Sequence, residues 1–96
     1  MFAIVRLDQI KLAAPLALEQ FDQMRRTQPG YVGTIVVDLQ AGRRLVLNLW
    51  ESEEYSAAAL SVLGPEDGRL LEPLMSHPPE LVGAGTVIST DLVPSP

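Results

Sequence analysis

The side chains best suited to chemistry are Asn48 and Trp50, which stand two residues apart near the middle of the chain. In an extended strand, residues i and i+2 point to the same side, so this amide and this indole would share one face. An amide can donate hydrogen bonds to a developing oxyanion, and an indole can form an aromatic wall. We therefore take Asn48 and Trp50 as candidate catalytic residues, with core or interface packing as the alternative for Trp50.

Two further side chains could move a proton or hold an anion. His77 is the only imidazole of the chain and a third candidate catalytic residue, because its ordinary pKa lies near neutrality. It precedes two prolines, so a solvated loop is the alternative. Arg6 could hold an anionic group of a substrate, or it could pair with a carboxylate of the protein. The other candidate substrate-binding residues share the predicted face of Asn48 and Trp50: Ile4, Thr34, Val36 and Val46.

The composition excludes several kinds of site. The 96 residues include no cysteine, which rules out disulfides, thiolate catalysis and Cys-based zinc sites. No group of histidine or carboxylate side chains has metal-ligand spacing, so the sequence predicts no metal site. Gly83-Ala84-Gly85 follows no strand-to-helix turn and is therefore not a nucleotide-binding fingerprint.

Charge and hydropathy limit the partners. The net charge is −5 and no basic stripe exists, so neither nucleic acid nor an anionic membrane is expected as a partner. No run of about 18 apolar residues is present to span a bilayer. Residues 1–11 lack the basic region and the small-residue cleavage site of a signal peptide, which favours a cytoplasmic location.

Residues 31–51 are expected to position Asn48 and Trp50. Two runs rich in β-branched and apolar residues flank a short turn there, which is the pattern of a β-hairpin. A three-residue loop, 40–42, would place Gly42 where the backbone needs a positive φ. The resulting register sets four pairs opposite one another: Asp38 and Arg44, Val36 and Val46, Thr34 and Asn48, Val32 and Trp50. The first of these would be a cross-strand ion pair.

This register gives the hairpin two unlike faces. The aliphatic face consists of Ile35, Val37, Leu39, Leu45, Leu47 and Leu49. The mixed face combines Val32, Val36, Val46 and Trp50 with Thr34, Asp38, Arg44 and Asn48. We expect helices to cover the aliphatic face. The mixed face is too apolar to be solvated. We therefore expect it, together with Phe2, Ile4 and Arg6, to meet a second copy and enclose a small-molecule cavity.

Periodicity and turn residues indicate the other elements. Strands are predicted over 2–8 and 81–92, and helices over 16–27 and 53–63, with a short helix from 65 to about 75 after a break at Gly64-Pro65. Gly83 and Gly85 indicate a bulge or a close approach, and residues 93–96 a frayed tail. The β-α-β-β-α-β order predicts one α+β domain over residues 1–96, with a ferredoxin-like antiparallel sheet and both helices on one face.

Three short motifs stand at the ends of the predicted strands: Pro29-Gly30-Tyr31, Leu49-Trp50-Glu51-Ser52 and Val82-Gly83-x-Gly85-x-Val87. Together they resemble the antibiotic biosynthesis monooxygenase family, which belongs to the dimeric α/β-barrel superfamily. The resemblance covers residues 2–92. It implies a ferredoxin-like protomer and a homodimer in which two sheets meet. It also implies a small-molecule pocket, either between each sheet and its helices or within the barrel.

The family implies two kinds of activity. Some members are cofactor-free oxygenases of polycyclic phenols, and Asn48 and Trp50 resemble their pocket residues by strand position. Others degrade haem with an Asn, Trp and His set whose Asn lies on the first strand, where this chain has Phe2, Ile4 and Arg6. The resemblance thus implies a cofactor-independent monooxygenase acting on a small aromatic or polyketide-like substrate. The chain has one histidine, no cysteine and no clustered carboxylates for acid–base catalysis. This favours the alternative, a non-catalytic dimeric binding or accessory domain.

Overall fold

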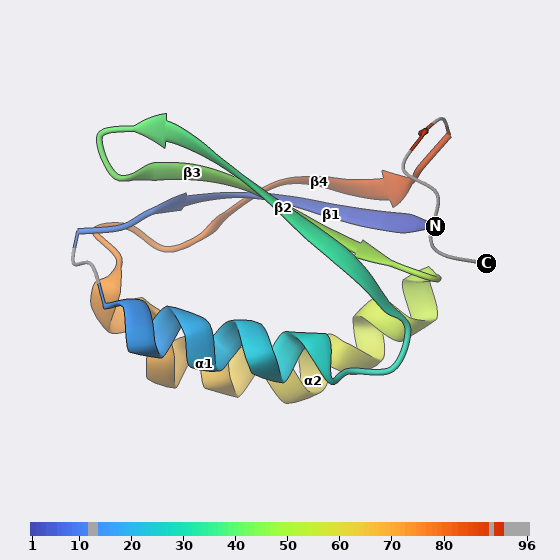
Figure 1. The fold of residues 1–96 in the computed structure, drawn as a ribbon, viewed down its shortest axis with the longest axis horizontal. Helices are drawn as coiled ribbons and strands as arrows, with labels where there is room; N and C mark the ends of the chain where they lie inside the picture. The colour runs from blue at the N-terminus through green and yellow to red at the C-terminus, as the bar shows by residue number, and fades with distance from the viewer. Residues whose placement is uncertain (12–13, 89, 92–96) are drawn as a thin grey trace.

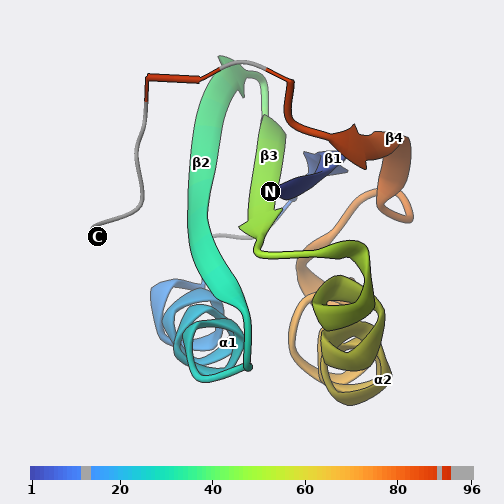
Figure 2. The same ribbon diagram turned by 90° about the vertical axis from the view of Figure 1, so that its right-hand side faces the viewer.

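The computed structural model of the chain describes residues 1–11, 14–88 and 90–91. Its elements are, in order, β1 (Phe2–Gln9), α1 (Pro15–Arg26), β2 (Tyr31–Gln40), β3 (Arg43–Trp50), α2 (Glu53–Leu70), the 3₁₀ turn η1 (Glu72–Leu74) and β4 (Glu80–Thr86). The strands form one antiparallel sheet in the order β2-β3-β1-β4. Both helices lie on the same side of this sheet (Figure 1, Figure 2). The predicted ferredoxin-like α+β fold is therefore confirmed.

The second helix is longer than the sequence suggests. Its start is as expected, because the Ser52 hydroxyl caps it and accepts a hydrogen bond from the Tyr55 N–H. The predicted break at Gly64-Pro65 is wrong, since α2 continues through Pro65 to Leu70. A proline inside a helix removes its own N–H donor and crowds the carbonyl four residues earlier, so packing must offset that cost. Side chains buried on both sides of it, Ala59 before and Leu71 after, hold the whole helix against the sheet.

The hairpin keeps most of the predicted register through a different turn. Three of the predicted pairs are observed: Thr34 with Asn48, Val36 with Val46, and Asp38 with Arg44. Ala41 and Gly42 both have positive φ, 55° and 77°, and form a two-residue turn. The register shifts between Asp38 and Gln40, which compensates for the shorter loop. A second shift sets Tyr31 opposite Trp50, so the predicted Val32–Trp50 pair is wrong.

The Asp38 carboxylate has a different role from the predicted ion pair. It accepts a hydrogen bond from the backbone N–H of Gln40 at 2.8 Å, at the point where the strand register shifts. Among the residues that the structure describes, no ion pair joins Asp38 to Arg44. The carboxylate therefore stabilises the bulge next to the turn instead of bridging the strands.

The two faces of the sheet are covered in the opposite way from the prediction. Most of the mixed face lies under the helices, where Trp50 is 3% exposed and Val46 5% exposed, whereas Val36 on β2 remains 53% exposed. The aliphatic face is open, and Ile35 and Val37 remain 38% and 41% exposed on it. The prediction placed the helices on the wholly aliphatic face and left the mixed face, with its polar residues, to a second copy. In the fold those polar groups find partners under the helices, where the large indole of Trp50 is also buried.

The last strand is shorter than predicted. β4 ends at Thr86, and residues 92–96, which include the predicted frayed tail, lie outside the described residues. The predicted bulge is confirmed, because Val5 pairs with Gly83 while Arg6 pairs with Leu81. A Cβ atom at Gly83 would meet no other atom within 4 Å. The bulge therefore explains this glycine, and a close approach of another segment does not.

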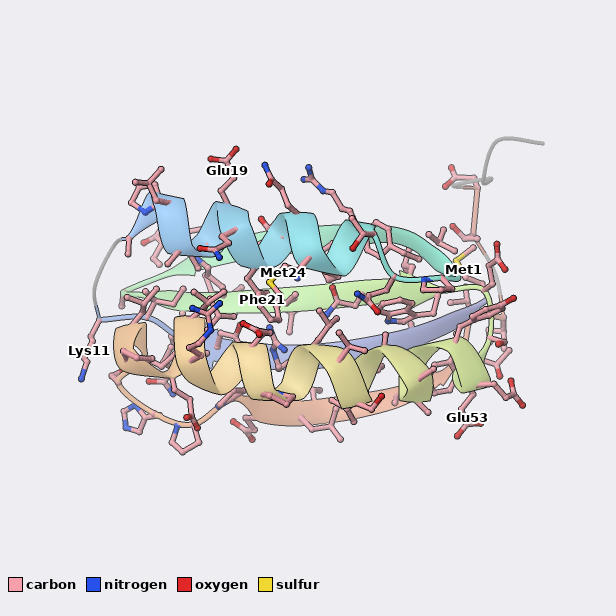
Figure 3. The ribbon with its side chains drawn as sticks, turned by 90° about the horizontal axis from the view of Figure 1, so that it is seen from below. Met1, Lys11, Glu19, Phe21, Met24 and Glu53 are labelled. Carbon is pink, nitrogen blue, oxygen red and sulfur yellow. The ribbon has the colours of Figure 1, made fainter. Side chains whose placement is uncertain are left out.

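The core lies between the mixed face and the helices. Its buried residues come from every layer: Phe21, Trp50, Ala59, Leu63, Leu71 and Leu74. Figure 3 shows Phe21 reaching from α1 into the space between the two helices and the sheet. Within the described ranges, no helix is long and apolar enough to cross a lipid bilayer.

Candidate functional site

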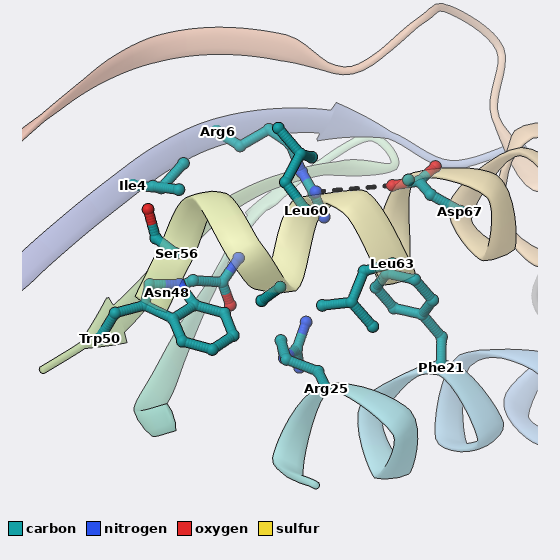
Figure 4. Close-up of a pocket in the computed structure, with 12 residues that line it drawn as sticks. Ile4, Arg6, Phe21, Arg25, Asn48, Trp50, Ser56, Leu60, Leu63 and Asp67 are labelled. Carbon is teal, nitrogen blue, oxygen red and sulfur yellow. Dashed lines mark ion pairs between the residues drawn. The ribbon is translucent and has the colours of Figure 1, made fainter. Parts of the chain in front are cut away.

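A cavity of about 100 Å³ lies between the mixed face of the sheet and the helices (Figure 4). Its walls come from β1 and β3 (Ile4, Arg6, Asn48, Trp50), from α1 (Phe21, Arg25) and from α2 (Ser56, Ala59, Leu60, Leu63, Gly64, Asp67). The cavity is partly open to solvent. The fold thus brings together four of the residues predicted for the site: Ile4, Arg6, Asn48 and Trp50.

Asn48 is 7% exposed and is held by a short chain of hydrogen bonds. Its Oδ1 accepts a bond from the Thr34 hydroxyl at 2.9 Å, and that hydroxyl lies 2.8 Å from the Tyr31 hydroxyl. The Tyr31 ring also packs edge-on against Trp50, with centroids 5.6 Å apart. Because Thr34 engages the amide oxygen, the amide NH₂ is the group that Asn48 offers to the cavity. Thr34 therefore positions Asn48 and does not itself line the cavity.

Arg6 lies between two carboxylates. Its Nη2 donates a hydrogen bond to Asp8 Oδ2 at 3.0 Å, and its Nε lies 2.8 Å from Asp8 Oδ1 in an ion pair that falls short of hydrogen-bond geometry. Its Nη1 lies 3.6 Å from Asp67 Oδ2, which belongs to α2. Figure 4 shows this Arg6–Asp67 pair at one end of the cavity. The charge of Arg6 is therefore already balanced within the protein.

Asp67 is the one carboxylate among the residues that line this cavity. Burial raises the pKa of its carboxyl group above the ordinary value. The Arg6 guanidinium opposes this shift, and the carboxylates of Asp8 and Glu72 add to it. The protonated form of Asp67 is therefore favoured more strongly here than in water.

Arg25 is a second buried cation at the cavity. It is 6% exposed, and its guanidinium lies 5.9 Å from the centre of the Phe21 ring. Its Nη2 donates a hydrogen bond to Asp22, which is half-exposed. Its Nε is buried and has no hydrogen-bond partner among the described residues. Such an unmatched donor is costly unless a ligand or water satisfies it.

A second, smaller cavity of about 70 Å³ adjoins the first. Arg6, Phe21 and Arg25 line both cavities and divide them. Val36 and Val46, which the sequence assigned to substrate binding, line this second cavity and not the first. Their predicted role therefore depends on a ligand that extends past Phe21.

His77 lies apart from both cavities. It is exposed, and its Nδ1 is 3.2 Å from the Ser76 hydroxyl. It lines a surface depression with Glu72, Met75, Ser76 and Pro78. The predicted catalytic role of His77 stays a prediction that receives no geometric support from the cavity.

Two further residues of the cavity, Arg25 and Asp67, were not predicted from the sequence. A signal existed for Arg25, because it follows the apolar Phe21 by four residues and so lies on the same face of α1. Asp67 likewise follows Leu63 by four residues on α2. The predicted helix break at Gly64-Pro65 hid that relation. Over the part of the chain that the structure describes, no three histidine, cysteine or carboxylate residues group as metal ligands would.

The sequence matches no protein-family model and no curated protein. Solved structures do match in fold. A variant of SnoaB, a cofactor-independent oxygenase from Streptomyces nogalater, is 17% identical over 96% of this chain and 97% of its own, with a TM-score of 0.74. A protein assigned as an antibiotic biosynthesis monooxygenase from Chloroflexus aurantiacus is 16% identical over 98% of both chains, with a TM-score of 0.68.

A third match is MhuD, solved with two manganese protoporphyrin IX molecules per active site. It is 18% identical over 94% of this chain and 97% of its own, with a TM-score of 0.66. Identities this low establish a common fold. The chain therefore has the fold of the antibiotic biosynthesis monooxygenases, as its three strand-end motifs predict.

Proposed function

We propose that the chain is an enzyme of the antibiotic biosynthesis monooxygenase family that oxidises a small aromatic or polyketide-like substrate with O₂ and without a cofactor. The observation that carries the proposal is the burial of Asn48 and Trp50 in a cavity that the carboxyl group of Asp67 also lines. The fold supports it, because SnoaB, a cofactor-independent oxygenase, has the same fold. Substrates of this chemistry are readily deprotonated, and their anions react with O₂ directly.

The cavity residues suit the first step of that reaction, the formation of the anion. Asp67, whose pKa is raised by burial, accepts the proton of an activated CH₂ group next to a phenol or ketone. The Asn48 NH₂ group donates to the oxygen on which the negative charge collects, and Trp50 forms the apolar wall. The carbanion passes its electron pair to O₂ and forms a C–O bond. Protonation gives a hydroperoxide, and loss of water leaves the new carbonyl group.

The volume of the cavity limits the substrate. A dry cavity of about 150 Å³ binds benzene, so the cavity of about 100 Å³ holds a single ring only if part of the ligand extends through its open side. Leu60 lines that cavity and is 66% exposed, so its side chain is the wall most free to move. We therefore expect one-ring substrates to be oxidised faster than three-ring substrates.

Purified protein is incubated with O₂ and easily oxidised phenols of one, two and three rings, the last of the anthrone type, and quinone formation and O₂ uptake are measured. The Asn48→Ala substitution is expected to lower turnover about ten- to a hundredfold, because a hydrogen bond to a charged group is worth about 1.5–3 kcal/mol. Trp50→Phe should lower it less. Ser61→Ala is the control, since Ser61 is exposed and its hydroxyl donates to the Ala58 carbonyl of its own helix.

The same assay decides between the alternatives. The oxygenase proposal fails if no phenol is oxidised faster than in buffer alone. Binding of these phenols without turnover would instead support a non-catalytic binding domain. The His77→Ala variant tests the role predicted for that residue. An absorbance titration with haem tests the minor alternative that the chain binds or degrades haem, as some members of the family do.

The open aliphatic face carries a separate part of the proposal, a homodimer. Ile35, Val36, Val37 and Leu39 are each at least 37% exposed on β2. Ile35, Val37 and Leu39 belong to the face opposite the helices, which a second copy would cover by placing its own sheet there. This arrangement replaces the predicted contact through the mixed face. The cytoplasmic location stays a prediction from the N-terminal sequence.

A further inference from the structure

Arg25 stands out among the charged groups of the cavity because its charge is only partly matched. Its side chain is 7% exposed, whereas that of its ion-pair partner Asp22 is 41% exposed. Water therefore weakens the attraction of Asp22 for the guanidinium. The buried Nε–H has no acceptor among the described residues. Figure 4 shows the Arg25 side chain rising from α1 toward the middle of the cavity.

The other cation of the cavity differs in its carboxylate partners: Arg6 Nε also lacks hydrogen-bond geometry, but it lies against the buried Asp8 carboxylate. Arg6 has Asp8 on one side and Asp67 on the other, at 2.8 Å and 3.6 Å. An anionic ligand at Arg6 would meet two carboxylates, while one at Arg25 Nε would meet a free donor. Electrostatics thus favour Arg25 as the place where a negative group binds.

The surroundings of Arg25 specify the rest of the ligand. Phe21 lies beside the guanidinium, and Trp50 and Leu63 complete an apolar wall in the same cavity. A planar ring fits such a wall, and an acidic group on the ring would reach the guanidinium.

We propose that Arg25 is the anion-binding subsite of the cavity and that its ligand is a one-ring aromatic acid, with a carboxylate or an acidic phenol against Nε. This inference names the substrate class of the proposed oxygenase. It rests on the proposed function only in calling the ligand a substrate. The binding itself requires the cavity alone. Arg25 is a specificity-determining residue that holds the ligand and takes no proton from it.

The chain offers its own reporter for the test. Trp50 is the only tryptophan, so the indole N–H gives a single signal in a ¹H–¹⁵N spectrum, and Trp50 lines the cavity. Benzoate and benzamide serve as probes because they have nearly the same shape and differ in charge. Each is titrated into the wild-type protein at constant pH and salt while the shift of the Trp50 signal is followed. Benzoate is expected to bind at least about tenfold more tightly than benzamide.

Matched variants assign the preference to one residue. Arg25→Met removes the charge at similar length and should abolish the difference between the two probes. Arg26→Met makes the same change one residue later, on the exposed side of α1, and should preserve it. Circular dichroism confirms that each variant is folded. Arg25→Lys keeps the charge without the Nε donor and should retain only part of the preference, which serves as a second test if Arg25→Met unfolds.

The outcomes separate this inference from the proposed function. Equal binding of the two probes, no binding of either, or a preference that survives Arg25→Met overturns the subsite. Oxidation of phenols together with any of these results would leave the oxygenase proposal standing alone. A benzoate preference that depends on Arg25, without oxidation of any phenol, would support the subsite and contradict the oxygenase.

Discussion

At the scale of single residues, the ionisation of Asp67 makes both the cavity's chemistry and the folding stability depend on pH. It is an acid at the end of a hydrophobic cavity, where burial works against its charged form and Arg6 compensates only in part. The same property serves the proposed reaction, because a carboxylate with a raised pKa holds an abstracted proton more firmly. Its raised pKa also makes folding stability depend on pH.

The Asp67→Asn variant tests this link. The folded state raises the pKa of Asp67, so the stability that the protonated acid contributes is complete below about pH 3.9 and is lost as pH rises through the folded-state value. Asparagine does not ionise and suffers no such loss. The free energy of unfolding of Asp67→Asn, relative to wild type, is therefore expected to increase from pH 3.5 to pH 7.5.

Urea unfolding followed by Trp50 fluorescence measures this difference at each pH. Glu19→Gln, which removes an exposed carboxylate from α1, is the control variant. A relative stability of Asp67→Asn that falls as the pH rises would contradict the assignment of burial as the dominant influence.

At the scale of elements, the turn between α1 and β2 depends on one glycine. Gly30 has a φ of +78°, and a Cβ atom there would overlap the ring of Tyr55 at the start of α2. Its carbonyl also accepts the Glu51 N–H at 2.8 Å, which links the turn to the end of β3. We expect Gly30→Ala to lower the free energy of unfolding by at least about 2 kcal/mol.

Gly33→Ala is the matched control. Gly33 lies three residues later on β2, has no positive φ, and a Cβ atom there would meet nothing within 4 Å. Its effect on the free energy of unfolding is expected to stay within about 0.5 kcal/mol. Urea unfolding compares the two variants, and equal losses of stability would show that the contact with Tyr55 is not what requires the glycine.

The same elements show what local sequence can predict. Period-two alternation predicted β1, the hairpin and its register near Asn48, because strand pairing depends on neighbouring residues. It also predicted that Ile4 and Arg6 would join Asn48 and Trp50. Which face the helices cover was predicted wrongly, because that choice depends on which polar groups find partners across the whole fold. Asp67 was missed because α2 was predicted to break at Gly64-Pro65, and Arg25 because its place on the Phe21 face of α1 was not weighed.

At the scale of the whole molecule, the uncovered side of the sheet predicts association. We expect wild-type protein at about 10 µM to have twice the chain mass of 10.4 kDa in analytical ultracentrifugation. Ile35→Asp should shift it to the monomer, because a charge would be buried between two apolar sheets. Leu16→Asp changes an 82% exposed leucine on α1, on the helical side, and should leave the mass unchanged. A wild-type monomer would contradict the homodimer.

The position of β2 at the edge of the sheet makes a protomer without its dimer partner prone to aggregation. In the described sheet β2 is one of the two edge strands, ten residues long, with a neighbour on one side only. A newly made protomer therefore exposes an unpaired strand edge next to an apolar sheet face. Other chains can pair with that edge and aggregate. Acidification that neutralises the net charge of −5 would remove the mutual repulsion that delays such aggregation. Rapid dimerisation would therefore protect the protein from precipitation as well as stabilise its fold.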